Sequence, residues 1–252
     1  NLQTAGNVND YNQKPVGTGP FTFVAYQPDA VIRYKANPDY YKGKEKIDDL
    51  VFAITPDATV RVQKLKSGEC QIMPYPNAAD VADLKSDSNL TVLEQAGLNV
   101  AYLAYNTTQP PFDKVEVRKA LNMAVDKKAI VDAVFQGLAE VAKNPIPPTM
   151  WSYNDSIQDD PYDPEKAKQM LADAGVKDLH MKIWAMPVSR PYMLNARRSA
   201  EIIQAGFADV GVPAEMVTYQ WGDYLTRAGA QDPDGSDMPG RPGANGRPRP
   251  GP

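Results

Sequence analysis

The first hundred residues contain short runs in which apolar and polar side chains alternate. In "FTFVA", "VIRYK" and "LVFAI" the apolar positions are largely β-branched or aromatic, which is typical of strands. The helix that follows begins at Thr55 or Asp57, either of which can cap its first amides, and ends at Gly68. The pattern predicts strands at 21–25, 31–35, 50–54 and 71–76, and a second short helix within 77–89.

The second part of the chain combines strands with longer helices. "NVAYLAYN" is apolar on both faces, which predicts a strand at 99–106 that is buried on both sides. Asp113 and Asp163 stand where helix N-caps are expected, and Pro164 suits the first helical position. The pattern predicts helices near 114–124, 127–136, 164–174, 195–209 and 221–229, and strands at 179–185 and 214–219. The resulting strand-helix-strand unit indicates an α/β lobe.

The C-terminal segment 229–252 has a different composition. It is rich in Gly and Pro and contains no aromatic residue and no Leu, Ile or Val. Such a segment buries too little apolar surface to offset an ordering entropy of about 1–2 kcal/mol per residue. It is therefore expected to be disordered, or to be an extended strap bound to the rest of the protein.

Composition and charge narrow the class of protein. The 252 residues are 42% hydrophobic and 23% charged, which suits one or two globular domains. The net charge is −4 and no basic stripe interleaves with aromatic residues, so nucleic acid is not an expected partner. No apolar run approaches the roughly 20 residues that span a bilayer. The chain starts "NLQTAGNVND", without a visible signal peptide, and is expected to be a mature product, a fragment or a cytosolic protein.

Catalytic and metal-binding chemistry find little support. Cys70 is the one cysteine and His180 the one histidine, which is too few for a zinc site. The motifs GxSxG, HExxH, GxGxxG and GxxxxGK[ST] are all absent. Paired acids such as those in "QDDPYD" occur in polar stretches and are expected to be solvated surface. We therefore expect no enzyme, no metal and no cofactor, but a protein that binds a ligand without transforming it.

Arg190 is the main candidate for binding. It lies in "WAMPVSRPY", in a loop between a predicted strand and a predicted helix, where packing does not require a long cation. No acidic residue lies within five positions of it. The alternative is a structural arginine that pairs with a local Asp or covers apolar surface.

Several long strings occur in one order that resembles a known family. They are "PVGTGPFTFVAYQPDAVIRYKANPDYYKG", "IDDLVFAITPDATVRVQKLKSGECQIMPYPN", "GLNVAYLAYN", "VRKALNMAVDKKAI", "NPIPPTMW", "YDPEKAKQML" and "WAMPVSRPY". Together they resemble the periplasmic dipeptide-binding proteins, the receptors that deliver peptides to an ABC transporter. The resemblance covers about residues 14 to 228.

The resemblance implies an α/β fold of the two-lobed periplasmic-binding-protein type, in the class with an extra domain, with the ligand enclosed between the lobes. Family members are about twice as long as this chain, so the chain resembles a central piece of one. It would hold an incomplete first lobe at 1–98, a hinge-crossing strand at 99–108 and most of the second lobe at 109–228, followed by the atypical tail at 229–252.

The resemblance also implies a site and partners. Arg190 would pair with the C-terminal carboxylate of a dipeptide or short peptide, Tyr192 would be the aromatic residue beside it, and Trp221 would line the cleft, with a core tryptophan as the alternative. The protein would be a periplasmic monomer with its signal peptide removed, and would hand its ligand to an inner-membrane ABC permease. The alternatives are an inactive proteolytic or truncated fragment, or a relative that carries haem, nickel or longer peptides.

Two features of this chain depart from the family pattern. The aspartate that grips the peptide amine in the family aligns with Ala244, and Arg247 and Arg249 stand where the motif has further aspartates. The tail is then either a sequence artefact or a lost amine clamp. The family also joins the cysteine of "GECQIM" to one near the mature N-terminus, which this chain lacks. Cys70 is therefore expected to be reachable by solvent, the other possibility being a small buried residue.

Overall fold

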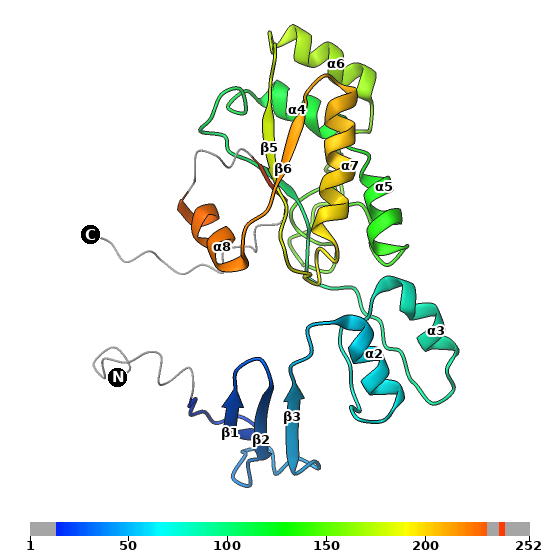
Figure 1. Ribbon diagram of the computed structural model, residues 1–252, viewed down its shortest axis with the longest axis vertical. Helices are drawn as coiled ribbons and strands as arrows, with labels where there is room; N and C mark the ends of the chain where they lie inside the picture. The colour runs from blue at the N-terminus through cyan, green and yellow to red at the C-terminus, as the bar shows by residue number, and fades with distance from the viewer. Residues whose placement is uncertain (1–13, 231–236, 240–252) are drawn as a thin grey trace, which may run out of the picture. The chain divides into compact units, whose positions relative to one another are not determined.

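The computed structural model describes residues 14–230 and 237–239. The chain divides into two compact units, Asn1–Pro76 and Asn77–Pro252 (Figure 1). The two units are defined by contacts within the chain and not by the lobes of a two-lobed fold. The lobe boundaries predicted from the sequence therefore stay predictions. Among the described residues, no helix is both long enough and apolar enough to cross a membrane.

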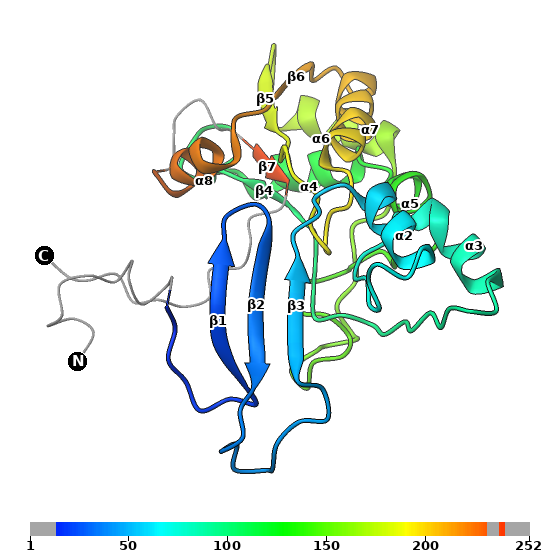
Figure 2. The same cartoon turned by 60° about the horizontal axis from the view of Figure 1, so that its bottom comes forward.

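The first unit is built on an antiparallel sheet. Its strands β1 (Phe21–Gln27), β2 (Val31–Ala36) and β3 (Asp49–Ala53) lie side by side in that order (Figure 2), which confirms the three strands predicted from alternation. The rings of Phe23, Tyr34 and Phe52 form a row across the sheet, with edge-to-face contacts at centroid distances of 5.9 and 6.0 Å. Such cross-strand aromatic contacts stabilise the pairing of the strands.

Helix α2 (Ala58–Lys66) follows the sheet as predicted. Asp57 is its N-cap and accepts a hydrogen bond from the Val60 amide at 2.8 Å, and Gly68 ends the helical segment with a φ of +77°. The prediction of a strand at 71–76 is wrong, because the structure has no strand at these residues. Tyr75 lies between two prolines and has a φ of +55°, so this backbone cannot continue an extended ladder.

The second unit contains a mixed four-stranded sheet in the order β4-β7-β5-β6. Its strands are β4 (Leu103–Tyr105), β5 (Met181–Trp184), β6 (Ala214–Val217) and β7 (Asp237–Pro239). Strands β5 and β6 are parallel and are joined by helix α7 (Ala196–Asp209), which confirms the predicted strand-helix-strand unit (Figure 1).

The helices of this unit also agree with the prediction. They are η1 (Ala78–Asp80), α3 (Val81–Ser86), α4 (Val115–Met123), α5 (Lys127–Ile130), the π-helical turn η2 (Val131–Phe135), α6 (Pro164–Asp173) and α8 (Trp221–Ala230). Asp163 caps α6 by accepting from the Lys166 amide at 3.0 Å. Asp113 does not cap α4, which has Lys114 at its N-cap and no side-chain capping bond.

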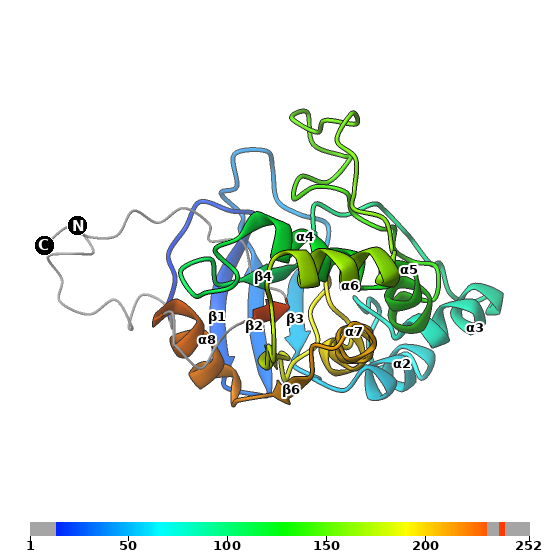
Figure 3. The same ribbon diagram turned by 90° about the horizontal axis from the view of Figure 1, so that it is seen from above.

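The main core of the second unit lies between α4, α6, α7 and the sheet. Helices α4 and α6 lie side by side (Figure 3), and residues such as Val117 and Leu171 are buried between the elements. A Cβ placed on Gly206 of α7 would overlap the carbonyl oxygen of Ala124, which follows α4. The two backbones therefore approach more closely than any larger residue at position 206 allows.

Two predictions at the edges of this unit are corrected. The strand expected at 99–106 is limited to Leu103–Tyr105, the three residues that pair with β7. The tail is not wholly irregular, since 229–230 end α8 and 237–239 form β7, an extended segment paired with the sheet. The other tail residues, including Ala244, Arg247 and Arg249, lie outside the described residues.

Candidate ligand-binding site

A tight turn after β5 carries Arg190. The backbone amide of Arg190 donates to the carbonyl of Met193 at 3.0 Å, and the amide of Met193 donates back to Arg190 at 2.9 Å. Pro191 and Tyr192 are the central residues of this turn, and the proline fixes one of its backbone angles. Arg190 and Tyr192 are therefore presented by one closed piece of backbone.

The guanidinium of Arg190 lies over the indole ring of Trp221. The distance from the guanidinium carbon to the ring centroid is 4.6 Å, within the range of a cation–π contact. One side-chain nitrogen also donates to the Ser189 carbonyl at 3.1 Å. Within the described part of the chain, Arg190 forms no ion pair with a carboxylate, although both it and Trp221 are partly buried. Most of its donors thus remain available to a ligand.

Trp221 belongs to a group of four rings that we call the aromatic cluster: Trp184, Tyr219, Trp221 and Tyr224. Trp221 and Tyr224 are one turn apart on α8 and stack at 5.5 Å with an angle of 18° between their planes. Tyr224 also contacts Trp184 at 5.9 Å, and Trp184 contacts Tyr219 at 5.0 Å. The cluster therefore connects α8 to the end of β5, the strand that precedes the Arg190 turn in the chain.

Tyr192 is partly buried and packs against the same hydrophobic group as Trp221. Its hydroxyl lies 3.9 Å from the sulfur of Met186, a weak acceptor. The structure thus places Tyr192 beside the cluster, with a hydroxyl that no strong partner among the described residues holds.

Tyr224 is a deeply buried polar residue near this site. It is only 1% exposed, and its hydroxyl has no hydrogen-bond partner among the described residues. Burial raises the pKa of Tyr224 well above its usual value, and the phenols of Tyr192 and Tyr102 raise that pKa further. Tyr224 is therefore a neutral phenol under all ordinary conditions.

The three residues selected from the sequence thus lie around one turn and one helix start. Arg190 and Trp221 are in contact, and Tyr192 shares the Arg190 turn. Tyr224 and Trp184 were not predicted from the sequence as site residues. The available signal was the i, i+3 spacing of Trp221 and Tyr224 in "WGDY", which places both rings on one face of a helix.

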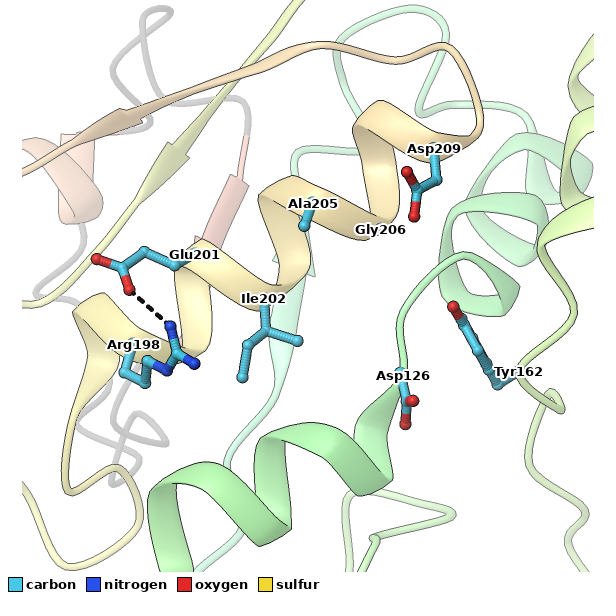
Figure 4. A pocket seen from close by; sticks show the side chains of 8 residues that line it. All are labelled: Asp126, Tyr162, Arg198, Glu201, Ile202, Ala205, Gly206 and Asp209. Carbon is cyan, nitrogen blue, oxygen red and sulfur yellow. Dashed lines mark hydrogen bonds and ion pairs between the residues drawn. The ribbon is translucent and has the colours of Figure 1, made fainter.

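A separate hollow of about 300 Å³ lies against α7 (Figure 4). It is lined by Asp126, Tyr162, Arg198, Glu201, Ile202, Ala205, Gly206 and Asp209. Three of its charged groups have structural partners, since Asp126 caps α5 and Glu201 pairs with Arg198 at 3.2 Å. No predicted site residue lines this hollow.

The described residues offer little to a metal ion. They contain no group of three or more His, Cys, Asp or Glu side chains that could hold a metal ion. Cys70 is a free thiol and is partly buried rather than enclosed in a core, so it is within reach of solvent as expected.

Comparison with known proteins gives the family. The model of the bacterial extracellular solute-binding proteins, family 5 Middle, matches residues 2–239. The chain belongs to this family. Family 5 proteins are solute-binding proteins, and the resemblance stated from the sequence is confirmed.

Two curated family 5 relatives illustrate the range of ligands. The chain is 55% identical over 228 residues to the dipeptide-binding protein of Escherichia coli, covering 90% of this chain and 43% of that protein. It is 53% identical over 225 residues to heme-binding protein A of Haemophilus influenzae, covering 89% of this chain and 41% of that protein. The chain thus spans less than half the length of these relatives.

A solved family 5 structure has the same fold. The dipeptide-binding protein of Pseudoalteromonas sp. SM9913, in complex with Met-Leu, is 36% identical and superposes with a TM-score of 0.83. The match covers 94% of this chain and 47% of that one. The fold class is therefore the mixed α/β class of the periplasmic binding proteins of this family, and the chain corresponds to part of it.

Proposed function

We propose that this chain is part of the substrate-binding component of an ABC transporter. The protein binds dipeptides or short peptides in the periplasm and delivers them to an inner-membrane permease, acting as a monomer and without chemistry on its ligand. Family membership and the names of the 52–55% identical relatives support this proposal. In this proposal the ligand-binding residues are Arg190, Tyr192 and Trp221.

The observation that carries the proposal is that the guanidinium of Arg190 is held in place by Trp221 but is not paired with a carboxylate of any described residue. A guanidinium binds a carboxylate with two parallel hydrogen bonds, and partial enclosure from water strengthens the pair. Arg190 is held over Trp221 and forms no ion pair with any described residue. Its free donors suit the C-terminal carboxylate of a peptide, with Tyr192 and Trp221 as the neighbouring aromatic surface.

The test is the substitution Arg190→Ala in the full-length protein. Removing one side of a desolvated charge pair costs about 2–5 kcal/mol, so we expect the dissociation constant of a dipeptide to rise by roughly 30-fold or more. Arg227→Ala is the matched control, because Arg227 also lies over a ring of the aromatic cluster, 4.5 Å from the centroid of Tyr219. We expect this control to retain its affinity. Calorimetry that gives an unchanged constant for Arg190→Ala would remove Arg190 from the site.

Ligand variants complement the protein variants. A dipeptide whose C-terminus is an amide offers no carboxylate to Arg190 and should bind far more weakly than the free acid. Free amino acids should also bind poorly, since a site that holds both charged ends of a dipeptide sets the distance between them. Equal affinity for acid and amide would contradict the proposal.

Haem is the second candidate ligand, because heme-binding protein A is 53% identical over the matched region. The propionates of haem are carboxylates, so Arg190 could serve this ligand as well. Titration with haemin separates the two candidates. A saturable change in the haem absorption band that is lost in Arg190→Ala would favour haem over peptide.

A further inference from the structure

The ring of Trp221 contacts two other side chains near the proposed carboxylate site. One is with the guanidinium of Arg190 at 4.6 Å, and the other is with the ring of Tyr224 at 5.5 Å. Trp221 is partly buried and stands at the first position of α8, where few backbone bonds restrain it. Its orientation therefore depends on the side chains that touch it.

Tyr224 is the more firmly held of these neighbours. It is 1% exposed, its amide donates to the Gln220 carbonyl at 2.8 Å, and its ring also contacts Trp184 of β5 at 5.9 Å. Trp184 is itself 1% exposed. Tyr224 thus joins the start of α8 to β5, the strand that precedes the Arg190 turn in the chain.

We propose that Tyr224 is a positioning residue for the carboxylate site: its ring holds Trp221 in the orientation that directs Arg190 toward the peptide carboxylate. This inference rests on the proposed function. Tyr224 acts through Trp221 and does not itself touch the ligand. The ring carries the effect, because the neutral hydroxyl has no partner among the residues that the structure describes.

The experiment measures carboxylate preference, not affinity alone. The preference is the ratio of the dissociation constants of a dipeptide amide and the same dipeptide as free acid, obtained by calorimetry on the full-length protein. General destabilisation of the protein weakens the binding of both ligands by the same factor and leaves this ratio unchanged. Misplacement of Arg190 weakens the binding of the free acid alone and lowers the ratio.

The variants separate the ring from the hydroxyl and from the rest of the cluster. An aromatic contact of this kind corresponds to about a three- to tenfold effect, so Tyr224→Leu should lower the ratio by that factor. Tyr224→Phe keeps the ring and should retain the ratio within about twofold. Tyr219→Leu removes a ring whose aromatic and cation–π contacts among the described residues are with Trp184 and Arg227, and should retain the ratio too. If Tyr224→Leu does not fold, Tyr224→Met, which fills the space without a ring, replaces it.

The outcomes are distinguishable. A lowered ratio in Tyr224→Leu alone supports the positioning role. A wild-type ratio in Tyr224→Leu, with only the melting temperature lowered, shows a merely structural residue and overturns the inference. An equal loss in Tyr224→Phe assigns the effect to the hydroxyl and also overturns it. A ratio near one in the unsubstituted protein would instead refute the proposed function.

Discussion

The environment of a single side chain decides what that side chain can do in this protein. Arg190 could be selected from the sequence because it stands in a loop without a nearby acid, and because its surrounding string resembles a family motif. For Tyr224 the i, i+3 spacing could indicate a shared helix face with Trp221, but not its burial, since that depends on Trp184, which is 40 positions away in the sequence. Contacts between distant segments leave no mark in local spacing.

A residue-scale prediction concerns Lys143 and Asp155. The Lys143 ammonium donates to the Asp155 carboxylate at 2.8 Å, which lowers the pKa of Asp155 and raises that of Lys143. Because the pKa of Asp155 is lowered on folding, the carboxylate stabilises the folded state at pH values above the usual carboxyl pKa, and this stabilisation is lost as the pH falls through the folded-state pKa. Because the pKa of Lys143 is raised on folding, the ammonium stabilises the folded state at pH values below the usual lysine pKa. The pair therefore contributes to stability between about pH 4 and 10.

The measurement is an NMR titration of the Asp155 carboxyl group. Lys143→Met should return the pKa of Asp155 toward its usual value. Lys128→Met, which removes a separate exposed ion pair with Asp132, should leave it unchanged. An Asp155 pKa that does not respond to Lys143→Met would show that the hydrogen bond is not its cause.

At the scale of elements, local signals predicted what local forces determine. Alternation and caps located β1, β2, β3 and the helices α2 and α6, because each of these signals acts within a few residues. The predictions failed where other constraints dominate. Prolines and the positive φ of Tyr75 prevent a strand at 71–76, and β4 is confined to the three residues that pair with β7, a segment distant in the sequence.

The crossing of α7 over the end of α4 gives an element-scale prediction. Gly206→Ala would force a methyl group onto the Ala124 carbonyl, and overpacking of this kind costs about 1–3 kcal/mol. We expect urea denaturation to show a free energy of unfolding lower by about 2 kcal/mol. Gly222→Ala is the control, because a Cβ at this helical position meets no atom of the other described residues outside its own helix backbone within 4 Å. This variant should leave stability equal or up to about 1 kcal/mol higher. Equal stability of both variants would mean that the helices can separate without cost.

At the scale of the molecule, the chain is two compact units that together span less than half of the Escherichia coli and Haemophilus influenzae relatives. The organisation into an incomplete first lobe at 1–98, a hinge strand at 99–108 and a second lobe at 109–228 remains our proposal. Sequence strings could indicate the family because they are long and ordered, whereas the enclosure of a ligand depends on contacts between segments that local spacing does not encode.

A whole-molecule prediction follows from the two charges of a dipeptide. In the proposed function Arg190 pairs with the carboxylate, but a buried charge without a partner costs several kcal/mol, and the proposed site residues include no partner for the amine. The 252-residue chain by itself should therefore bind dipeptides in the millimolar range or more weakly, whereas we expect the full-length protein to bind them in roughly the micromolar range. Calorimetry on both, with one dipeptide panel, makes the comparison. Micromolar binding by the segment alone would show that it already contains an amine partner.

The contact between Arg190 and Trp221 also gives the protein an optical signal of its own. The three tryptophans have three different surroundings: Trp184 is 1% exposed, Trp151 is 96% exposed, and Trp221 lies under a guanidinium. A carboxylate that engages Arg190 changes the charge over one indole only, so the emission of Trp221 changes while the other two supply a constant background. Replacing Trp151 with Phe removes the water-exposed part of that background, and occupancy of the site can then be followed by fluorescence without any attached dye.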